Sequence, residues 1–130
     1  MSRVTELLGC EHPILQGAMG VISNPEMVAA VSEAGGFGLL ATAFAPDLET
    51  VRSQIRATRG LTDRPFGANL QVMNPNTAEI AGLLAGESVP AVTLSGGSPR
   101  ALIPLLKEKG IKTLAVVPTV DVARKAAQLG

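Results

Sequence analysis

Five short runs of aliphatic and β-branched residues recur along the chain at nearly constant spacing, and this spacing limits the possible folds most strongly. The runs are Pro13–Gln16, Gly38–Ala41, Phe66–Leu70, Ala91–Leu94 and Thr113–Val117. Their first residues lie 25, 28, 25 and 22 positions apart, which is room for one strand and one helix. The pattern therefore predicts parallel βαβ units. The runs hardly alternate with polar residues, as expected for strands that are covered on both faces.

Helix start and stop signals fall between these runs. Asn24-Pro25 and Ser98-Pro99 each offer an N-cap followed by proline, and Pro46-Asp47 opens another helix. Glycines such as Gly35-Gly36 and Gly110 mark helix ends. With further helices starting near Asn76 and Asp121, residues 1–130 read as five βα units in a single domain.

Two architectures accommodate five such units. One is a doubly wound, flavodoxin-like domain, which can close at this size. The other is the first five units of a (β/α)₈ barrel, which normally needs about 250 residues. An isolated piece of a barrel would leave its first and last strands as unpaired edges. The length of 130 residues taken alone favours the doubly wound domain.

Composition excludes several classes of function. Acidic and basic residues balance at 11 each, and only 2% of residues are aromatic, so nothing favours binding to nucleic acid. No apolar stretch is long enough to span a membrane, and the N-terminus does not resemble a secretory signal. One cysteine and one histidine, Cys10 and His12, do not suffice for a transition-metal site. We expect a cytoplasmic protein that binds a small molecule and no metal.

The segments that follow the strands are small or neutral and polar. They read Gln16-Gly17-Ala18-Met19-Gly20, Thr42-Ala43-Phe44-Ala45, Asn69-Leu70-Gln71, Ser95-Gly96-Gly97-Ser98 and Pro118-Thr119. Ligands of parallel α/β proteins bind at these carboxyl ends, and the absence of carboxylates and lysines there excludes a phospho-acceptor site and a phosphate loop. Backbone N–H groups beside glycine and two carboxamides on one side of a strand suit a neutral planar ring, such as that of a flavin.

Several of these segments resemble one family in order and spacing. Residues 13–20, 32–38, 61–70, 93–99 and 116–120 are similar to the nitronate monooxygenase family, formerly called 2-nitropropane dioxygenase. Its superfamily includes the flavin-dependent enoyl-acyl-carrier-protein reductase. The resemblance implies a (β/α)₈ TIM barrel that binds FMN, here truncated after its fifth βα unit, and it replaces the doubly wound alternative.

The resemblance also implies roles for particular residues. The flavin would contact Gly17, Ala18, Met19, Asn69 and Gln71. The substrate would meet the segment made by Ser95, Gly96 and Gly97. The implied reaction is oxidation of an alkyl nitronate with O₂. The family's catalytic histidine belongs to a Gly-Gly-His segment after the sixth strand, so no catalytic residue is assigned within residues 1–130, and His12 is not its counterpart.

Two other interpretations stay open at this point. The chain could be part of an enoyl-acyl-carrier-protein reductase, in which NADPH reduces FMN and FMN reduces an enoyl thioester. It could also be a non-catalytic α/β fragment that forms a homo-oligomer through its open strand edges.

Overall fold

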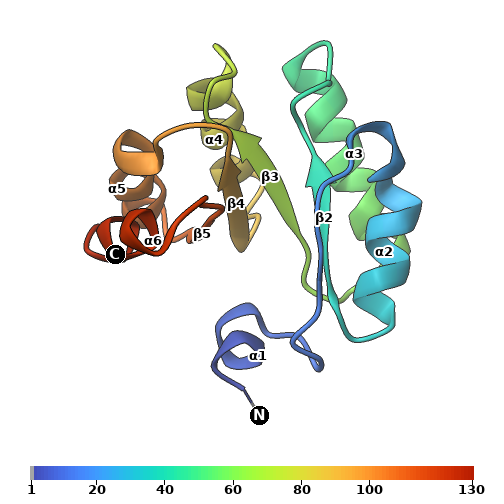
Figure 1. Ribbon diagram of the computed structural model, residues 1–130. Helices are drawn as coiled ribbons and strands as arrows, with labels where there is room; N and C mark the ends of the chain where they lie inside the picture. Colours follow the sequence, from blue (N-terminus) through green and yellow to red (C-terminus); the bar gives the residue numbers. More distant parts are fainter. Residues whose placement is uncertain (1) are drawn as a thin grey trace.

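One parallel sheet organises the computed structural model, which describes residues 2–130 (Figure 1). Its strands follow the order of the chain, β1-β2-β3-β4-β5. They are β1 (Leu15–Gln16), β2 (Phe37–Ala41), β3 (Gly67–Gln71), β4 (Ala91–Ser95) and β5 (Lys112–Ala115). Each strand overlaps one of the five predicted runs, so the spacing argument is confirmed.

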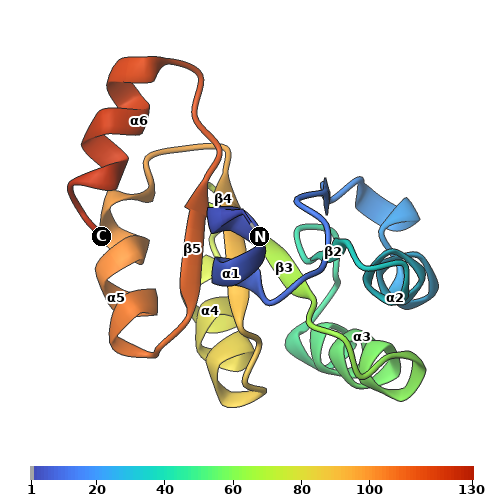
Figure 2. The same ribbon diagram turned by 90° about the horizontal axis from the view of Figure 1, so that it is seen from below.

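The strand order decides between the two architectures. A doubly wound flavodoxin-like sheet would run 2-1-3-4-5, whereas here every crossover advances by one strand in the same direction. The helices α2 to α6 consequently lie around the outside of a curved sheet, as the view from below shows (Figure 2). The fold is the first five units of a (β/α)₈ barrel, and the expectation from length alone was wrong. That expectation assumed that the sheet closes its own core, but β1 and β5 are edge strands.

The helices on the outer face are α2 (Pro25–Glu33), α3 (Leu48–Leu61), α4 (Thr77–Gly86), α5 (Leu102–Glu108) and α6 (Val120–Ala127). Asn24 caps α2 as predicted, since its side chain accepts a hydrogen bond from the Met27 N–H at 2.9 Å. Ser98 was expected to cap a helix, but its side chain makes no such bond, because Pro99 begins a 3₁₀ turn (Pro99–Ala101) ahead of α5.

Asp47 caps α3, and the hydrogen bonds of this cap displace the pKa of its carboxyl. Its Oδ1 accepts hydrogen bonds from the hydroxyl and the N–H of Thr50, both at 2.7 Å. These bonds favour the carboxylate, so they hold the pKa of Asp47 below its ordinary value. The cap therefore stabilises the fold at neutral pH, and this contribution is lost as the pH falls through the lowered pKa.

A short helix that the sequence analysis missed, α1 (Arg3–Leu8), covers the amino-terminal end of the barrel (Figure 2). A capping box starts it, in which Ser2 and Thr5 exchange hydrogen bonds between side chain and backbone. Leu8 and Cys10 then pack against the inner face of the sheet. The Lys112 ammonium also donates a hydrogen bond to the Leu7 carbonyl, which joins α1 to β5.

Apolar side chains cover the outer face of the sheet and the amino-terminal part of its inner face, which explains why the strand sequences hardly alternate. The outer face packs against the helices through a large cluster that includes Leu40, Leu70, Leu94, Ile55 and Leu106. The inner face carries a smaller cluster, Phe37, Leu39 and Ala91 with Leu8 and Cys10. Cys10 is buried in this cluster and forms no disulfide. His12 is exposed at the same amino-terminal end, where it can serve no site at the opposite end.

Gly67 occupies a point of the inner face that has no room for a side chain. A Cβ placed there would lie 2.5 Å from the Ala91 carbonyl oxygen and 2.8 Å from the Phe37 ring. The ring of Phe37 therefore fills the space that a residue on β3 would otherwise need.

We predict that Gly67→Ala lowers the free energy of unfolding by about 1–3 kcal/mol, because the new methyl group must displace backbone or a buried ring. Gly82→Ala is the matched control, since a Cβ on this exposed position of α4 meets nothing within 4 Å. The control should leave stability unchanged or raise it by up to about 1 kcal/mol. Urea unfolding followed by circular dichroism measures both, and equal effects of the two changes would contradict this packing.

Candidate functional site

The inner face of the sheet changes from apolar to polar along the barrel axis. Phe37, Leu39 and Ala91 are fully buried toward the amino-terminal end. Toward the carboxyl ends of β3 and β4 the same face presents Asn69 opposite Thr93, and Gln71 opposite Ser95. A polar floor is thus built from strand residues, at the end where parallel α/β proteins bind their ligands.

Asn69 is the centre of this polar floor. Its Oδ1 accepts hydrogen bonds from the Thr93 hydroxyl at 2.9 Å and from the Ser95 hydroxyl at 3.1 Å. Its main-chain carbonyl accepts a third from the buried Thr42 hydroxyl, at 2.7 Å. Across residues 2–130 no acceptor meets the Nδ2 group of Asn69, so this half-buried amide has two N–H donors free for a ligand.

Gln71 lies two residues beyond Asn69, at the carboxyl end of β3, and its side chain is exposed. Gly96 follows β4 and approaches it so closely that a Cβ on Gly96 would lie 3.2 Å from Gln71 Cγ. Gly96 and Gly97 have φ angles of +68° and +147°, which L-residues with a side chain rarely adopt. The structure thus brings together Asn69, Gln71, Ser95 and the glycine pair at one rim of the sheet.

The segment after β1 reaches the same rim, because β1 and β3 are parallel and flank β2. Buried Ser23 fixes its shape: the Ser23 hydroxyl accepts hydrogen bonds from the Met19 N–H at 2.7 Å and from Gln16 Nε2 at 2.9 Å. The Met19 N–H is therefore already used within the protein. The N–H groups of Gly17 and Ala18 stay available, and a Cβ on Gly17 would meet nothing within 4 Å.

Sequence reasoning missed the residues that hold this site in place. Thr93 sits inside an apolar run, where a hydroxyl residue two positions before Ser95 was the available signal. Gln16 was noted only as the end of a strand, yet its Oε1 accepts a hydrogen bond from the Leu39 N–H at 3.3 Å. Ser23 and Thr42 give no local signal, because their role depends on contacts with distant parts of the chain.

Two features are absent from residues 2–130. No three His, Cys, Asp or Glu side chains converge as metal ligands would. No helix in this part of the chain combines the length and the apolar character needed to cross a bilayer.

The chain is similar to known proteins in both sequence and fold. A sequence model described as nitronate monooxygenase matches residues 1–94. The chain belongs to the nitronate monooxygenase family. A nitronate monooxygenase of Pseudomonas aeruginosa is 46% identical over 79 residues, which are 61% of this chain and 22% of that protein.

Two other family relatives match along nearly the whole chain. A Rhodococcus jostii protein, (3aS,4S,5R,7aS)-5-hydroxy-7a-methyl-1-oxo-octahydro-1H-indene-4-carboxyl-CoA dehydrogenase, is 35% identical over 97% of this chain. The structure of FabK from Thermotoga maritima superposes on all of it with a TM-score of 0.94 and 39% identity. The chain spans 35% of the first relative's length and 42% of the second's, which agrees with a partial TIM barrel.

We predict that Ser23→Ala destabilises the protein by about 1–3 kcal/mol, because the Met19 N–H and the Gln16 amide lose a buried partner. Ser53→Ala on the exposed face of α3 is the control and should change stability by less than about 0.5 kcal/mol. Chemical denaturation compares the two. A Ser23→Ala protein as stable as the control would show that this hydroxyl does not fix the segment.

Proposed function

We propose that this chain provides the flavin-binding part of an FMN-dependent oxidoreductase that acts on alkyl nitronates. The observation that supports this most is the arrangement around Asn69. Its oxygen is occupied by the Thr93 and Ser95 hydroxyls, so its N–H₂ group is held ready for an acceptor on a bound ring. A flavin ring edge presents carbonyl and ring-nitrogen acceptors of this kind.

The residues at the rim fit a bound FMN in three further respects. The available N–H groups of Gly17 and Ala18 lie at the same carboxyl-terminal rim as Asn69, with no side chain on Gly17 to keep a ring away. Met19 contributes a side chain that is 46% exposed and apolar, suited to contact with the face of a ring. Below the polar floor lies the sealed apolar surface of Leu39 and Ala91, which excludes water from beneath the site.

FMN, when bound, supplies the transfer of electrons between substrate and acceptor. The chain's own residues would bind FMN and orient its ring. Asn69 and Gln71 would hold the ring edge, and Ser95, Gly96 and Gly97 would line the space where a nitronate enters. The only histidine, His12, lies exposed near Gly35, away from this rim, so we assign no proton transfer to residues 1–130.

A second candidate is chemistry on an acyl thioester. Similarity to the CoA dehydrogenase and to FabK extends over 97–100% of the chain, whereas the nitronate monooxygenase of P. aeruginosa matches over 61%. Two assays of the FMN-loaded protein distinguish these candidates. One supplies an alkyl nitronate and O₂, and the other supplies NADPH and an enoyl thioester. Absence of flavin together with association through the β1 and β5 edges would instead favour the non-catalytic interpretation.

We predict that Asn69→Asp weakens FMN binding about tenfold or more, which corresponds to about 1.4 kcal/mol. The carboxylate retains oxygen acceptors for Thr93 and Ser95 but has no N–H₂ to offer the ring. Asn76→Asp, in the exposed turn before α4, makes the same change of charge outside the inner face and should leave the affinity unchanged.

Titration followed by quenching of flavin fluorescence measures both dissociation constants, and circular dichroism confirms that both variants fold. Equal affinities of Asn69→Asp and the unaltered protein would contradict the proposed role of Asn69. Failure of the unaltered protein to bind FMN would overturn the flavin assignment for this chain.

A further inference from the structure

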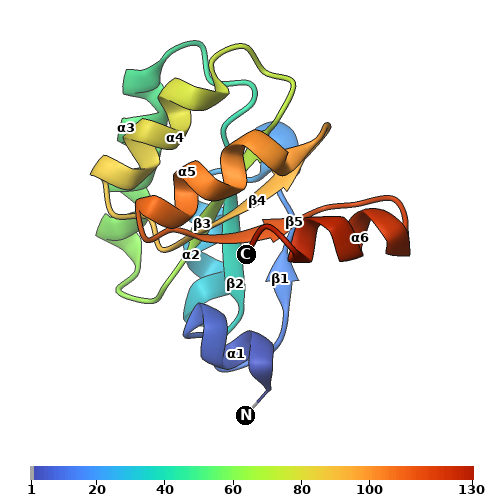
Figure 3. The same ribbon diagram turned by 90° about the vertical axis from the view of Figure 1, so that its left-hand side faces the viewer.

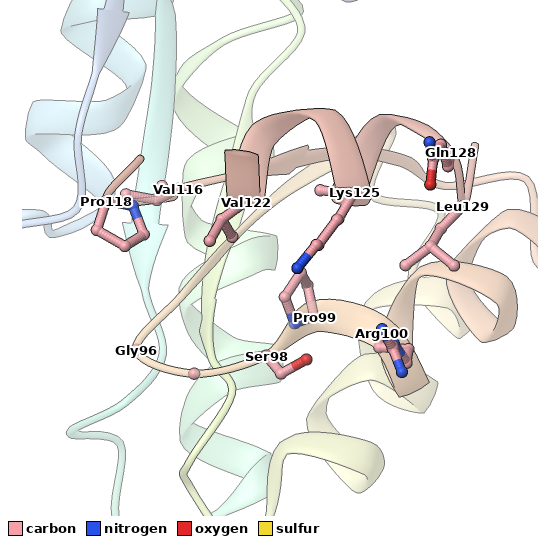
Figure 4. A pocket seen from close by; sticks show the side chains of 12 residues that line it. Gly96, Ser98, Pro99, Arg100, Val116, Pro118, Val122, Lys125, Gln128 and Leu129 are labelled. Atoms are coloured by element: carbon pink, nitrogen blue, oxygen red, sulfur yellow. The ribbon is translucent and has the colours of Figure 1, made fainter. Parts of the chain in front are cut away.

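A cavity of about 950 Å³ lies outside the inner face, between the segment after β4 and helix α6 (Figure 4). Gly96, Gly97 and Ser98 form one wall. Val122 of α6 and Leu129, which follows α6, form the other. Helix α6 runs beside β5, with its C-terminal end close to α5 (Figure 3). The cavity is an open groove between α6 and the segment after β4. This volume is at the upper end of the range for small-molecule sites.

The charged groups in the groove are all positive. Arg100 comes from the 3₁₀ turn before α5 and Lys125 from α6, and no carboxylate is among the lining residues that the structure describes. Lys125 extends from α6 toward Pro99 across the groove (Figure 4). Within residues 2–130, neither cation forms an ion pair, whereas Arg52, Arg56 and Arg59 share Glu87.

The rest of the lining is apolar. Val116 and Pro118, with Val122 of α6 and Leu129 after it, offer surface for an apolar or heteroaromatic body. Two unpaired cations beside such a surface match an amphipathic anion, because phosphate satisfies the charges and a ring or chain covers the apolar wall.

Only the glycine pair separates this groove from the polar floor. Gly96 adjoins Gln71 on its inner side, and a Cβ on Gly97 would lie 3.1 Å from Val72. The same two glycines line the groove on their outer side. An extended ligand can therefore cross them, with one end beside a ring held at Asn69 and the other at the cations.

We propose that this groove binds the phosphate-bearing tail of a nucleotide coenzyme, with Arg100 and Lys125 on the phosphates. The recognised chemistry is a phosphorylated ADP group, which coenzyme A and NADPH share. The tail belongs to an acyl-CoA substrate or to a reducing coenzyme whose reactive end reaches the flavin. This role rests on the proposed flavin site and on the second candidate function, chemistry on an acyl thioester, but binding to the groove does not.

Calorimetric titration with coenzyme A and, separately, with NADPH tests the proposal. Arg100→Gln and Lys125→Gln should each weaken binding about 3- to 10-fold, as expected for exposed charge contacts. Val122→Phe keeps every charge but narrows the groove, and should weaken binding at least tenfold. Lys109→Gln at the far end of α5 removes the same charge away from the groove and should have no effect.

The two coenzymes distinguish the sources of the tail: tighter binding of coenzyme A assigns it to a thioester substrate, and tighter binding of NADPH to the electron donor. Three results would overturn the proposal. They are an effect of Lys109→Gln equal to that of Lys125→Gln, inorganic phosphate binding as tightly as either coenzyme, and no binding at millimolar concentration.

FMN titrations separate this proposal from the flavin assignment. FMN should leave the affinity for the coenzyme unchanged, and mutual displacement would make the groove part of the flavin site and overturn a separate tail site. A protein that binds coenzyme A in the groove but no FMN would refute the proposed function while leaving the groove intact.

Discussion

The packing of α1 against the amino-terminal end of the sheet is the contact on which the rest of the structure depends. Because the crossovers place α2 to α6 on the outer face, those helices cannot cover the inner one. Leu8 and Cys10 reach that face and bury Phe37 and Leu39 there. With one end of the interior sealed by apolar side chains, a polar ligand site can form only at the other end.

That other end is rigid because it is made by strands rather than by loops alone. Thr93 and Ser95 of β4 donate hydrogen bonds to the Asn69 carboxamide oxygen, which fixes the orientation of the side chain. Thr42, beyond β2, donates to the main-chain carbonyl of Asn69 and holds the backbone in place. A donor fixed before a ligand arrives loses little conformational entropy on binding. Ser23 acts in the same way on the segment after β1, where its hydroxyl joins Met19 to Gln16.

The sequence predicted the elements well because each depends on local signals. The five strands follow from apolar runs at regular spacing, and the start of α2 follows from Asn24-Pro25. Asn69 was predicted as a site residue from its place at the end of a strand. Its partner Thr93 was not, since the pairing depends on the register of β3 and β4, which no local pattern specifies. The choice of a barrel required the family resemblance, because strand order is also a long-range property.

In the proposed site, the N–H₂ group of Asn69 and the N–H groups of Gly17 and Ala18 would face one flavin ring. The most direct measurement is a two-dimensional ¹⁵N–¹H NMR spectrum of the labelled protein, recorded during addition of FMN. We expect the Asn69 side-chain signals and the Gly17 and Ala18 backbone signals to shift together with one dissociation constant. Shifts confined to other residues, or different dissociation constants for these three, would contradict the account.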